Sequence, residues 1–376
     1  MKRIPCFVFI LIAFVWLFPL CLQAADSVLP NTLQASGAEQ VILSDGAADF
    51  MDENNISISD PQGTLSITPK IVFAHMWEAF KDKLMTPLKV LGGLIAVILL
   101  TAIIDGLGDT VQNQSVARVF SIISTLVCVG IVTEPICACI QNTSDALTNG
   151  GNFMISYVPV FSGILVASGS ITAAGSYNVI VLSVAEIFTQ LSSTLLMPLL
   201  GFCMALSVVE SINPAITLSG MTNGIKKVAT WGVGFLMTVF VGLLTLQSIT
   251  GTSVDTITIK AAKFVMSSAI PVVGSAISDA YTTLRGSLGL LRSGVGTYGV
   301  IALILTMLPS IFTVIATQLA VYLGSVGAEI FGVKAIAAFL KNVSNVLSIA
   351  LSLLLCFSIM LIVSTTIVMM MGMNLA

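Results

Sequence analysis

Charged side chains are scarce in this sequence: they make up only 9% of its 376 residues, and a single histidine is present. An average soluble domain carries about 25% charged and about 45–50% apolar residues, whereas this chain is 56% hydrophobic. A water-soluble fold of this length could not cover its surface with polar groups. The composition therefore excludes a soluble cytosolic enzyme, a nucleic-acid-binding protein and a disordered scaffold, and it predicts an integral membrane protein.

Groups that could carry catalysis are also few. His75 is the only histidine, so a cluster of histidine metal ligands is excluded, and a Ser-His-Asp triad would have to use this residue. Cys137 and Cys139 lack the spacing of a metal or redox motif, and we expect the cysteines to pack as small apolar side chains. No P-loop motif for binding nucleotide phosphates is present. We therefore predict no enzymatic activity, no cofactor and no metal.

The N-terminus has the pattern of a secretory signal. Lys2 and Arg3 precede an uncharged apolar run over residues 4–18, which predicts a signal peptide over residues 1–25. An uncleaved membrane anchor is the alternative. Residues 26–69 contain seven acidic residues and no lysine or arginine, which predicts a flexible acidic extracytoplasmic segment.

Residues 70–86 show a helical period. Phe73, Trp77 and Phe80 lie on one face of the predicted helix, and charged residues lie on the other. A helix divided in this way would lie in the headgroup layer of a membrane, with Trp77 as an aromatic anchor. Packing against a partner helix is the competing use.

Long uncharged stretches follow in residues 87–376, the predicted polytopic membrane domain. A transmembrane helix needs about 20 apolar residues, because every backbone polar group must pair within the segment. We count about seven or eight spans and predict an all-α polytopic membrane protein with additional amphipathic interfacial or re-entrant helices. Residues 177–212 are interpreted as two tightly turned helices, because Pro198 lies near the middle of this long run. The apolar stretches are 88–107, 119–140, 146–185, 187–209, 228–254, 293–328 and 342–376.

Basic residues favour one orientation. With two helices in residues 177–212, five basic residues fall in cytoplasmic loops, as the positive-inside bias favours, and four fall outside. The first group is Arg118, Lys226, Lys227, Lys334 and Lys341, and the second is Lys260, Lys263, Arg285 and Arg292.

Residues 256–296 are too polar for lipid-facing helices. Pro271 and Gly274 separate two amphipathic helical patterns. This predicts an interfacial or re-entrant hairpin, since a broken backbone at membrane depth needs protein or water around it. A plain loop lying on the bilayer is the alternative.

Three acids lie in apolar surroundings, where a carboxylate is costly. Glu134 precedes Pro135 and Glu210 lies near Pro214, so both are interpreted as ends of spans. Glu186 has no charged neighbour up to Glu210, and we predict a functional or inter-helical role for it.

Two segments, residues 157–163 and 269–275, share a proline followed by a glycine within apolar surroundings. Paired interruptions of this kind occur in the repeats of transporters, although seven similar positions also arise by coincidence. A secondary transporter or permease, with a path lined by Glu186 and these segments, is therefore one functional hypothesis.

The sequence also resembles a known family, the stage III sporulation protein AE family of endospore-forming Firmicutes. The resemblance extends over nearly the whole chain and is most specific in a central motif. Arg292-Ser293, where the family often has Lys-Asn, and an insertion at Tyr281 indicate a divergent member. The residues that carry the resemblance are Lys260–Val265, Ile270–Gly274, Ile277–Ala280, Thr283, Leu284, Gly286, Ser287 and Leu290–Arg292, together with Val158–Val160 and Ala167–Gly169.

The resemblance implies a non-enzymatic membrane subunit of the channel, or feeding apparatus, between mother cell and forespore, which is needed for late forespore gene expression. It implies a location in the mother-cell membrane that surrounds the forespore. The partners implied are the lipid bilayer, the other proteins of the stage III sporulation A operon, including an ATPase and ring-forming subunits, and indirectly the forespore's stage II sporulation protein Q. The family has no established catalytic residues. Lys263, Pro271, Gly274 and Asp279 match its motif and are candidate structural or interaction positions.

Overall fold

The computed structural model describes residues 41–58, 60–108, 114–191, 193–194, 197–212, 219–269 and 274–370. Every regular element in these ranges is a helix, which confirms the predicted all-α fold class. Six of the described helices are long and apolar enough to cross a membrane, fewer than the seven or eight expected from the sequence. The helices are α2 (Asp45–Glu53), α3 (Pro61–Leu65), α4 (Pro69–Gly108), α5 (Gln114–Ala167), α6 (Ile171–Leu191), α7 (Met197–Ile212), α8 (Ser219–Ala269), α9 (Gly274–Ile330) and α10 (Lys334–Met370).

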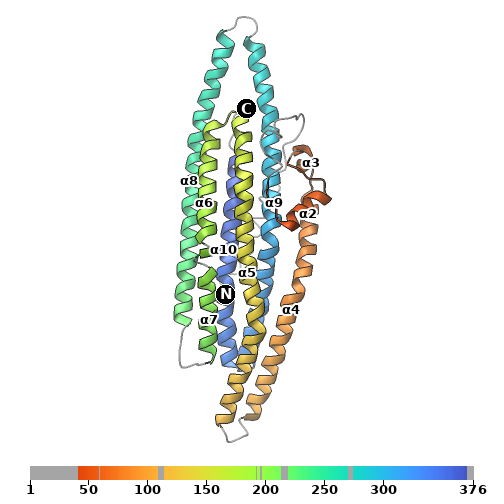
Figure 1. Cartoon of the computed structure of the whole chain (residues 1–376), viewed down its shortest axis with the longest axis vertical. Coiled ribbons are helices and arrows are strands. Elements are labelled where there is room, and N and C mark those ends of the chain that lie inside the picture. Colours follow the sequence, from red (N-terminus) through yellow and green to blue (C-terminus); the bar gives the residue numbers. More distant parts are fainter. Residues whose placement is uncertain are drawn as a thin grey trace.

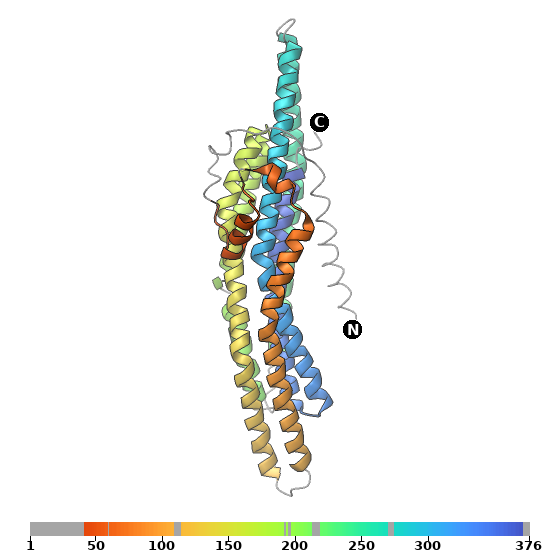
Figure 2. The ribbon, with the colours of Figure 1, turned by 90° about the vertical axis from the view of Figure 1, so that its right-hand side faces the viewer.

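The long helices run alternately down and up one elongated bundle (Figure 1). We call the end at which α8 and α9 approach each other the upper end, and the end at which α4 and α5 approach each other the lower end. Both pairs of helix ends project past the rest of the bundle (Figure 2). The 57 residues of α9 form a rod of roughly 85 Å, far longer than the ~30 Å hydrocarbon core of a bilayer.

Helices α9 and α10 form the centre of the bundle. α10 packs against α5, α6, α7, α8 and α9, and large side chains such as Leu303, Val314 and Phe339 are buried along this pair. The rings of Phe188 and Phe357 stack with their centroids 4.7 Å apart. Because lipid is as apolar as these side chains, close packing rather than removal from water holds the centre together. The five described cysteines are free thiols, and three of them are buried.

Two helix connections use the same compact turn. Gly169 after α5 has a φ of +85°, and Gly332 after α9 has a φ of +78°, values in the left-handed region that glycine adopts without a steric penalty. Each glycine sits in a Schellman turn, which pairs carbonyl groups at the end of one helix and allows the next helix to pack antiparallel to it. The backbone hydrogen bonds are Ser170 N–H to Leu165 O, Gly169 N–H to Val166 O, Val333 N–H to Ala328 O and Gly332 N–H to Glu329 O.

Residues 119–140 and 146–167 belong to one helix rather than to two separate spans. α5 is continuous over 54 residues and has Pro135 in its interior. Glu134 therefore lies inside a helix that is longer than the hydrocarbon core is thick, and its interpretation as the end of a span stays a prediction.

The polar stretch between these two apolar runs stays helical because its side chains pair locally. Gln141 Nε2 donates to Asp145 Oδ1 at 3.0 Å, one turn further along the helix. The Thr143 hydroxyl donates to the carbonyl of Cys139 at 2.7 Å. Polar groups that are satisfied along a helix face do not require the backbone to leave the helix.

The chain breaks within residues 177–212, as Pro198 indicated, but it does not turn back there. α6 ends at Leu191, and Pro198 is the second residue of α7, where a missing N–H costs no helical hydrogen bond. Both helices pack against α5, α8 and α10, and α7 continues downwards below α6 (Figure 1). The two helices form one interrupted crossing, so the expectation of two tightly turned helices is wrong.

Part of the acidic segment, residues 26–69, folds onto the bundle, which differs from the expected flexible segment. α2 buries Phe50 and Met51. The hydroxyl groups of Ser44, which precedes α2, and Thr306 of α9 are hydrogen-bonded at 3.0 Å. Apolar side chains spaced along an acidic helix thus give it one face that packs against its neighbours.

The helix expected over residues 70–86 is the first part of α4, which continues through Pro87 into the long apolar run. Trp77 is half exposed, while the ring of Phe80 meets that of Phe312 of α9 edge-on, with the centroids 5.1 Å apart. One face of this helix therefore packs against protein, and the other is available to the surroundings.

Candidate interaction site

Three of the predicted site residues belong to one helical hairpin. Lys263 lies near the end of α8, Gly274 is the first residue of α9, and Asp279 lies in the first two turns of α9. Pro271 lies outside the described residues, as do the side chains of Lys263 and Asp279. Glu186 is placed apart from them, on α6. We call residues 256–269 of α8 and 274–291 of α9 the upper hairpin.

The upper hairpin projects from the bundle as two antiparallel helix ends (Figures 1 and 2). Its α8 arm, residues 256–269, is roughly 20 Å long at about 1.5 Å per residue. Ile257 and Phe264 on this arm are 69% and 72% exposed, whereas Ile259 between them is buried. The arm therefore presents exposed apolar side chains that a lipid layer or a protein partner can cover.

Asp255 fastens the base of the upper hairpin to α6. Its carboxylate is 4% exposed and accepts hydrogen bonds from the backbone N–H of Thr172 at 3.1 Å and of Ala173 at 3.2 Å. Both amides lie in the first turn of α6, where N–H groups have no partner within the helix and the helix dipole favours a negative charge. Asp255 thus caps the N-terminus of a helix other than its own.

The contact around this cap is close. Gly251, one turn before Asp255, faces the backbone of α6, and a Cβ added to it would lie 3.3 Å from the Cα of Ala173. One turn earlier, the amide of Gln247 donates to the hydroxyl of Ser176. The spacing of four residues puts Gln247, Gly251 and Asp255 on one face of α8. Small residues and hydrogen bonds at a helix crossing are the usual packing mode of membrane helices.

Arg292 has the converse role at the base of the α9 arm. This side chain is 4% exposed, and its guanidinium donates to the carbonyl of Val368. Val368 lies in the last described turn of α10, and the dipole of a helix favours a positive charge toward its C-terminal end. Two buried charges of opposite sign therefore hold the hairpin base, each at the helix end that suits its sign.

A second polar cluster joins α7, α8 and α10 toward the lower end. Asn342 Nδ2 donates to Glu210 Oε2 at 2.9 Å, Lys226 Nζ donates to Asn345 Oδ1 at 2.8 Å, and Asn345 Nδ2 donates to Asn223 Oδ1 at 3.4 Å. Glu210 lies in the last turn of α7, as its interpretation as the end of a span requires. Hydrogen bonds between membrane helices contribute about 0.6 kcal/mol each on average. This cluster therefore sets how the helices align more than how strongly they bind.

Glu186 faces outward from the bundle. It is exposed on α6, and its neighbour Ile187 is 54% exposed. A carboxylate in an apolar, outward-facing stretch needs water, a lipid headgroup or a partner beside it. Residues 157–163 lie inside the continuous helix α5, so they are not an interruption of the kind found in transporter repeats, and residues 270–273 lie outside the described part of the chain.

Sequence reasoning missed Asp255 and the contact made by Arg292. Asp255 directly follows the uncharged stretch 228–254, a position that is ordinarily interpreted as the end of a span. Its spacing of four residues from Gly251 was the available signal that it lies on a helix-packing face. In the ranges that the structure describes, no three His, Cys, Asp or Glu side chains lie close enough together to hold a metal ion. The contacts of Asp255 and Arg292 position the helices at the base of the upper hairpin, and the α8 arm of the hairpin exposes apolar side chains.

Comparison with known proteins finds matches by sequence to one family. The sequence model of a family described as stage III sporulation protein AE matches residues 55–372. A curated relative, stage III sporulation protein AE of Bacillus subtilis (strain 168), is 24% identical over 242 residues, which cover 64% of this chain and 61% of the relative. The matched region thus spans less than two thirds of that relative's length. No solved structure matches the chain.

Proposed function

Because this chain belongs to the stage III sporulation protein AE family, we propose that it is a non-enzymatic membrane subunit of the channel or feeding apparatus between mother cell and forespore, required for late forespore gene expression. In this proposal it resides in the mother-cell membrane around the forespore. Its partners are the other products of the stage III sporulation A operon, including an ATPase and ring-forming proteins, and indirectly the stage II sporulation protein Q.

The observation that carries the proposal is the length of the apolar surface on α8. Exposed large apolar side chains recur from Val228 to Phe264, a stretch of roughly 54 Å along the helix. Even at a tilt of about 40° this stretch rises roughly 41 Å, whereas the hydrocarbon core is about 30 Å thick. A single bilayer therefore leaves part of this surface uncovered, and a protein partner on the upper hairpin would cover it.

The upper hairpin is the proposed partner-binding element. It combines the exposed Ile257 with the motif positions Lys263, Gly274 and Asp279, and its base is fixed by Asp255 and Arg292. A fixed base lowers the entropic cost of binding, because the surface is already in place before the partner arrives.

The test replaces Ile257 by aspartate in the native sporulating host. Ile257→Asp is expected to abolish both co-purification with the operon partners and expression of a late forespore reporter, while the chain still accumulates in the membrane. Ile257→Leu is the matched control and should behave as the wild type. A membrane-inserted Ile257→Asp chain that retains its partners and supports the reporter would contradict the proposal.

A secondary transporter remains the second candidate, favoured by the interruption between α6 and α7 and by Glu186 one to two turns before it. Because Glu186 faces outward, a path that it lines would lie between this chain and another. Purified chain in liposomes should then move a solute by itself, and Glu186→Gln should abolish that transport without affecting insertion. Liposomes that stay inert unless the operon partners are added favour the subunit instead.

A further inference from the structure

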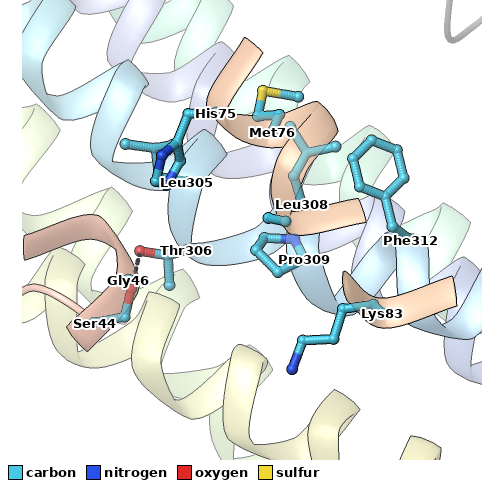
Figure 3. Close-up of a pocket in the computed structure, with 11 residues that line it drawn as sticks. Ser44, Gly46, His75, Met76, Lys83, Leu305, Thr306, Leu308, Pro309 and Phe312 are labelled. Atoms are coloured by element: carbon cyan, nitrogen blue, oxygen red, sulfur yellow. Dashed lines mark hydrogen bonds between the residues drawn. The ribbon is translucent and has the colours of Figure 1, made fainter. Parts of the chain in front are cut away.

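A cavity of about 330 Å³ lies between α2, α4 and α9 (Figure 3). It is separate from the upper hairpin, and the proposal built on it is independent of the proposed function. Its walls are apolar on the whole, with a few polar groups, and they include no carboxylate. The lining residues are Ser44, Gly46, His75, Met76, Ala79, Lys83, Leu305, Thr306, Leu308, Pro309 and Phe312.

The local sequence explains why a cavity exists here. Pro309 lies inside α9 and has no N–H, so the carbonyl of Leu305, four residues earlier, loses its helical donor. The hydrogen bond between Ser44 and Thr306 holds the start of α2, which forms the second wall, against α9. α4 supplies the third wall through His75 and Lys83, which are eight residues, or roughly 12 Å, apart on one helix.

The cavity is polar at one end and cationic at the other. The hydroxyl groups of Ser44 and Thr306 meet at one side of the cavity, and His75 lines it above them in the view of Figure 3. Lys83 lines the other end of the cavity. In the described part of the chain, no carboxylate lies within ion-pair distance of Lys83. The ammonium group is thus available to an anion that also contacts apolar side chains.

The cavity lies beside exposed apolar side chains of α4. Ile71, Phe73 and Trp77 are exposed on α4 above Lys83, and Met85 and Leu88 are the first of the exposed large apolar side chains below it. Tryptophan side chains and lysines concentrate where hydrocarbon gives way to headgroups. Lys83 therefore combines with Trp77 above it and with exposed apolar side chains below it, the residue types that contact a lipid headgroup and its acyl chains.

We propose that this cavity binds the headgroup of an anionic phospholipid. The phosphodiester pairs with the Lys83 ammonium, a charge-assisted contact that a soluble phosphate could make equally well. The acyl chains lie below it against α4, which only a lipid could supply. The hydroxyl-bearing part of the headgroup points up toward Ser44, Thr306 and His75. Phosphatidylglycerol, whose headgroup is a glycerol, has this chemistry.

The test measures lipid occupancy of the full-length chain by native mass spectrometry after delipidation and titration with defined lipids. Phosphatidylglycerol is expected to bind about tenfold more tightly than phosphatidylcholine, and Lys83→Gln is expected to remove most of that difference. Lys81→Gln is the matched control, because Lys81 has the same charge on the same helix but sits over the Trp77 ring. It should bind as the wild type does.

Two further variants separate the parts of the site. Ala79→Leu fills the cavity without changing its charge and should weaken phosphatidylglycerol binding, and a Ser44→Ala, Thr306→Val chain should bind phosphatidylglycerol no better than phosphatidic acid, which lacks the glycerol. Size-exclusion chromatography and circular dichroism check that each variant is folded.

Three results would overturn the proposal. The first is equal weakening by Lys83→Gln and Lys81→Gln, which would indicate general charge attraction. The second is equal binding of phosphatidylglycerol and phosphatidylcholine by the wild type. The third is displacement of the lipid by millimolar glycerol 3-phosphate or inorganic phosphate, which would assign the site to a soluble anion.

Discussion

Buried charges in this protein are matched to helix ends. Asp255 accepts from the first turn of α6, and Arg292 donates to the last turn of α10. Removing a charge from water is costly, but unpaired amides or carbonyls at a buried helix end are costly too, and one contact satisfies both requirements. In a chain with 9% charged residues, such positions are where a single substitution has the largest effect.

The first prediction concerns Asp255. Asp255→Ala leaves two amides of α6 without an acceptor and is expected to lower the stability of the bundle by about 1–3 kcal/mol. Asp255→Asn keeps one acceptor and should cost less. Denaturant titration in mild detergent, followed by circular dichroism, measures the difference, and Glu134→Gln, an exposed acid on α5, serves as the control. Equal stability of Asp255→Ala and the wild type would refute the role of the cap.

At the scale of elements, the packing of α5 against α9 depends on one aromatic residue. The ring of Tyr157 stacks between Phe153 and Phe161, with centroid distances of 5.1 and 5.5 Å, and its hydroxyl donates to the carbonyl of Val295 at 3.0 Å. Gly299 of α9 lies directly against this ring. The ring cannot move aside, because its faces and its hydroxyl are all engaged.

The second prediction follows from that contact. Gly299→Ala places a methyl group into the Tyr157 ring and is expected to destabilise the protein by about 1–3 kcal/mol. Gly163→Ala is the matched control, because open space surrounds that helical glycine and alanine favours a helix by about 0.5–1 kcal/mol. The two variants should shift the midpoint of thermal unfolding in opposite directions, and a shift in the same direction would show that α9 relaxes around the methyl group.

The elements also show where local sequence reasoning succeeds. Pro198 correctly indicated a break, because a proline removes a donor whatever surrounds it. Polar residues separate the apolar stretches 119–140 and 146–185, yet two of them, Gln141 and Asp145, satisfy each other within α5. Hydropathy reports the preference of a segment for lipid, but it does not report whether the next segment continues or reverses, since that depends on tertiary packing. The contact of Asp255 with α6, 83 residues away, could not be predicted for the same reason.

At the scale of the whole molecule, two pairs of expected spans each become one crossing: residues 119–140 with 146–167, and the two helices expected within residues 177–212. These mergers leave each group of basic residues at the same end of the bundle. Arg118, Lys226 and Lys334 belong to the lower end, and Lys260 belongs to the upper hairpin. Those are the two groups that eight spans would give, because each merger removes one crossing and the two mergers together remove an even number. The charge bias alone therefore does not distinguish six crossings from eight.

The third prediction distinguishes six crossings from eight by the side of the membrane on which residue 171 lies. Ile171→Cys, at the upper start of α6, should react with a membrane-impermeant maleimide from the same side as Gly286→Cys and from the opposite side to Phe331→Cys. All three positions are exposed, and the native cysteines are replaced in the background. A helix pair that turned back within residues 177–212 would put position 171 on the same side as position 331. That labelling pattern would disprove the interrupted crossing.

The anchored base of the upper hairpin has a mechanical consequence. A sideways load on the tip acts on a lever arm of roughly 20 Å whose fulcrum is the pair Asp255 and Arg292. The resulting torque acts on the start of α6 and on the end of α10. A force on the tip of the upper hairpin is therefore transmitted to α10, at the centre of the bundle.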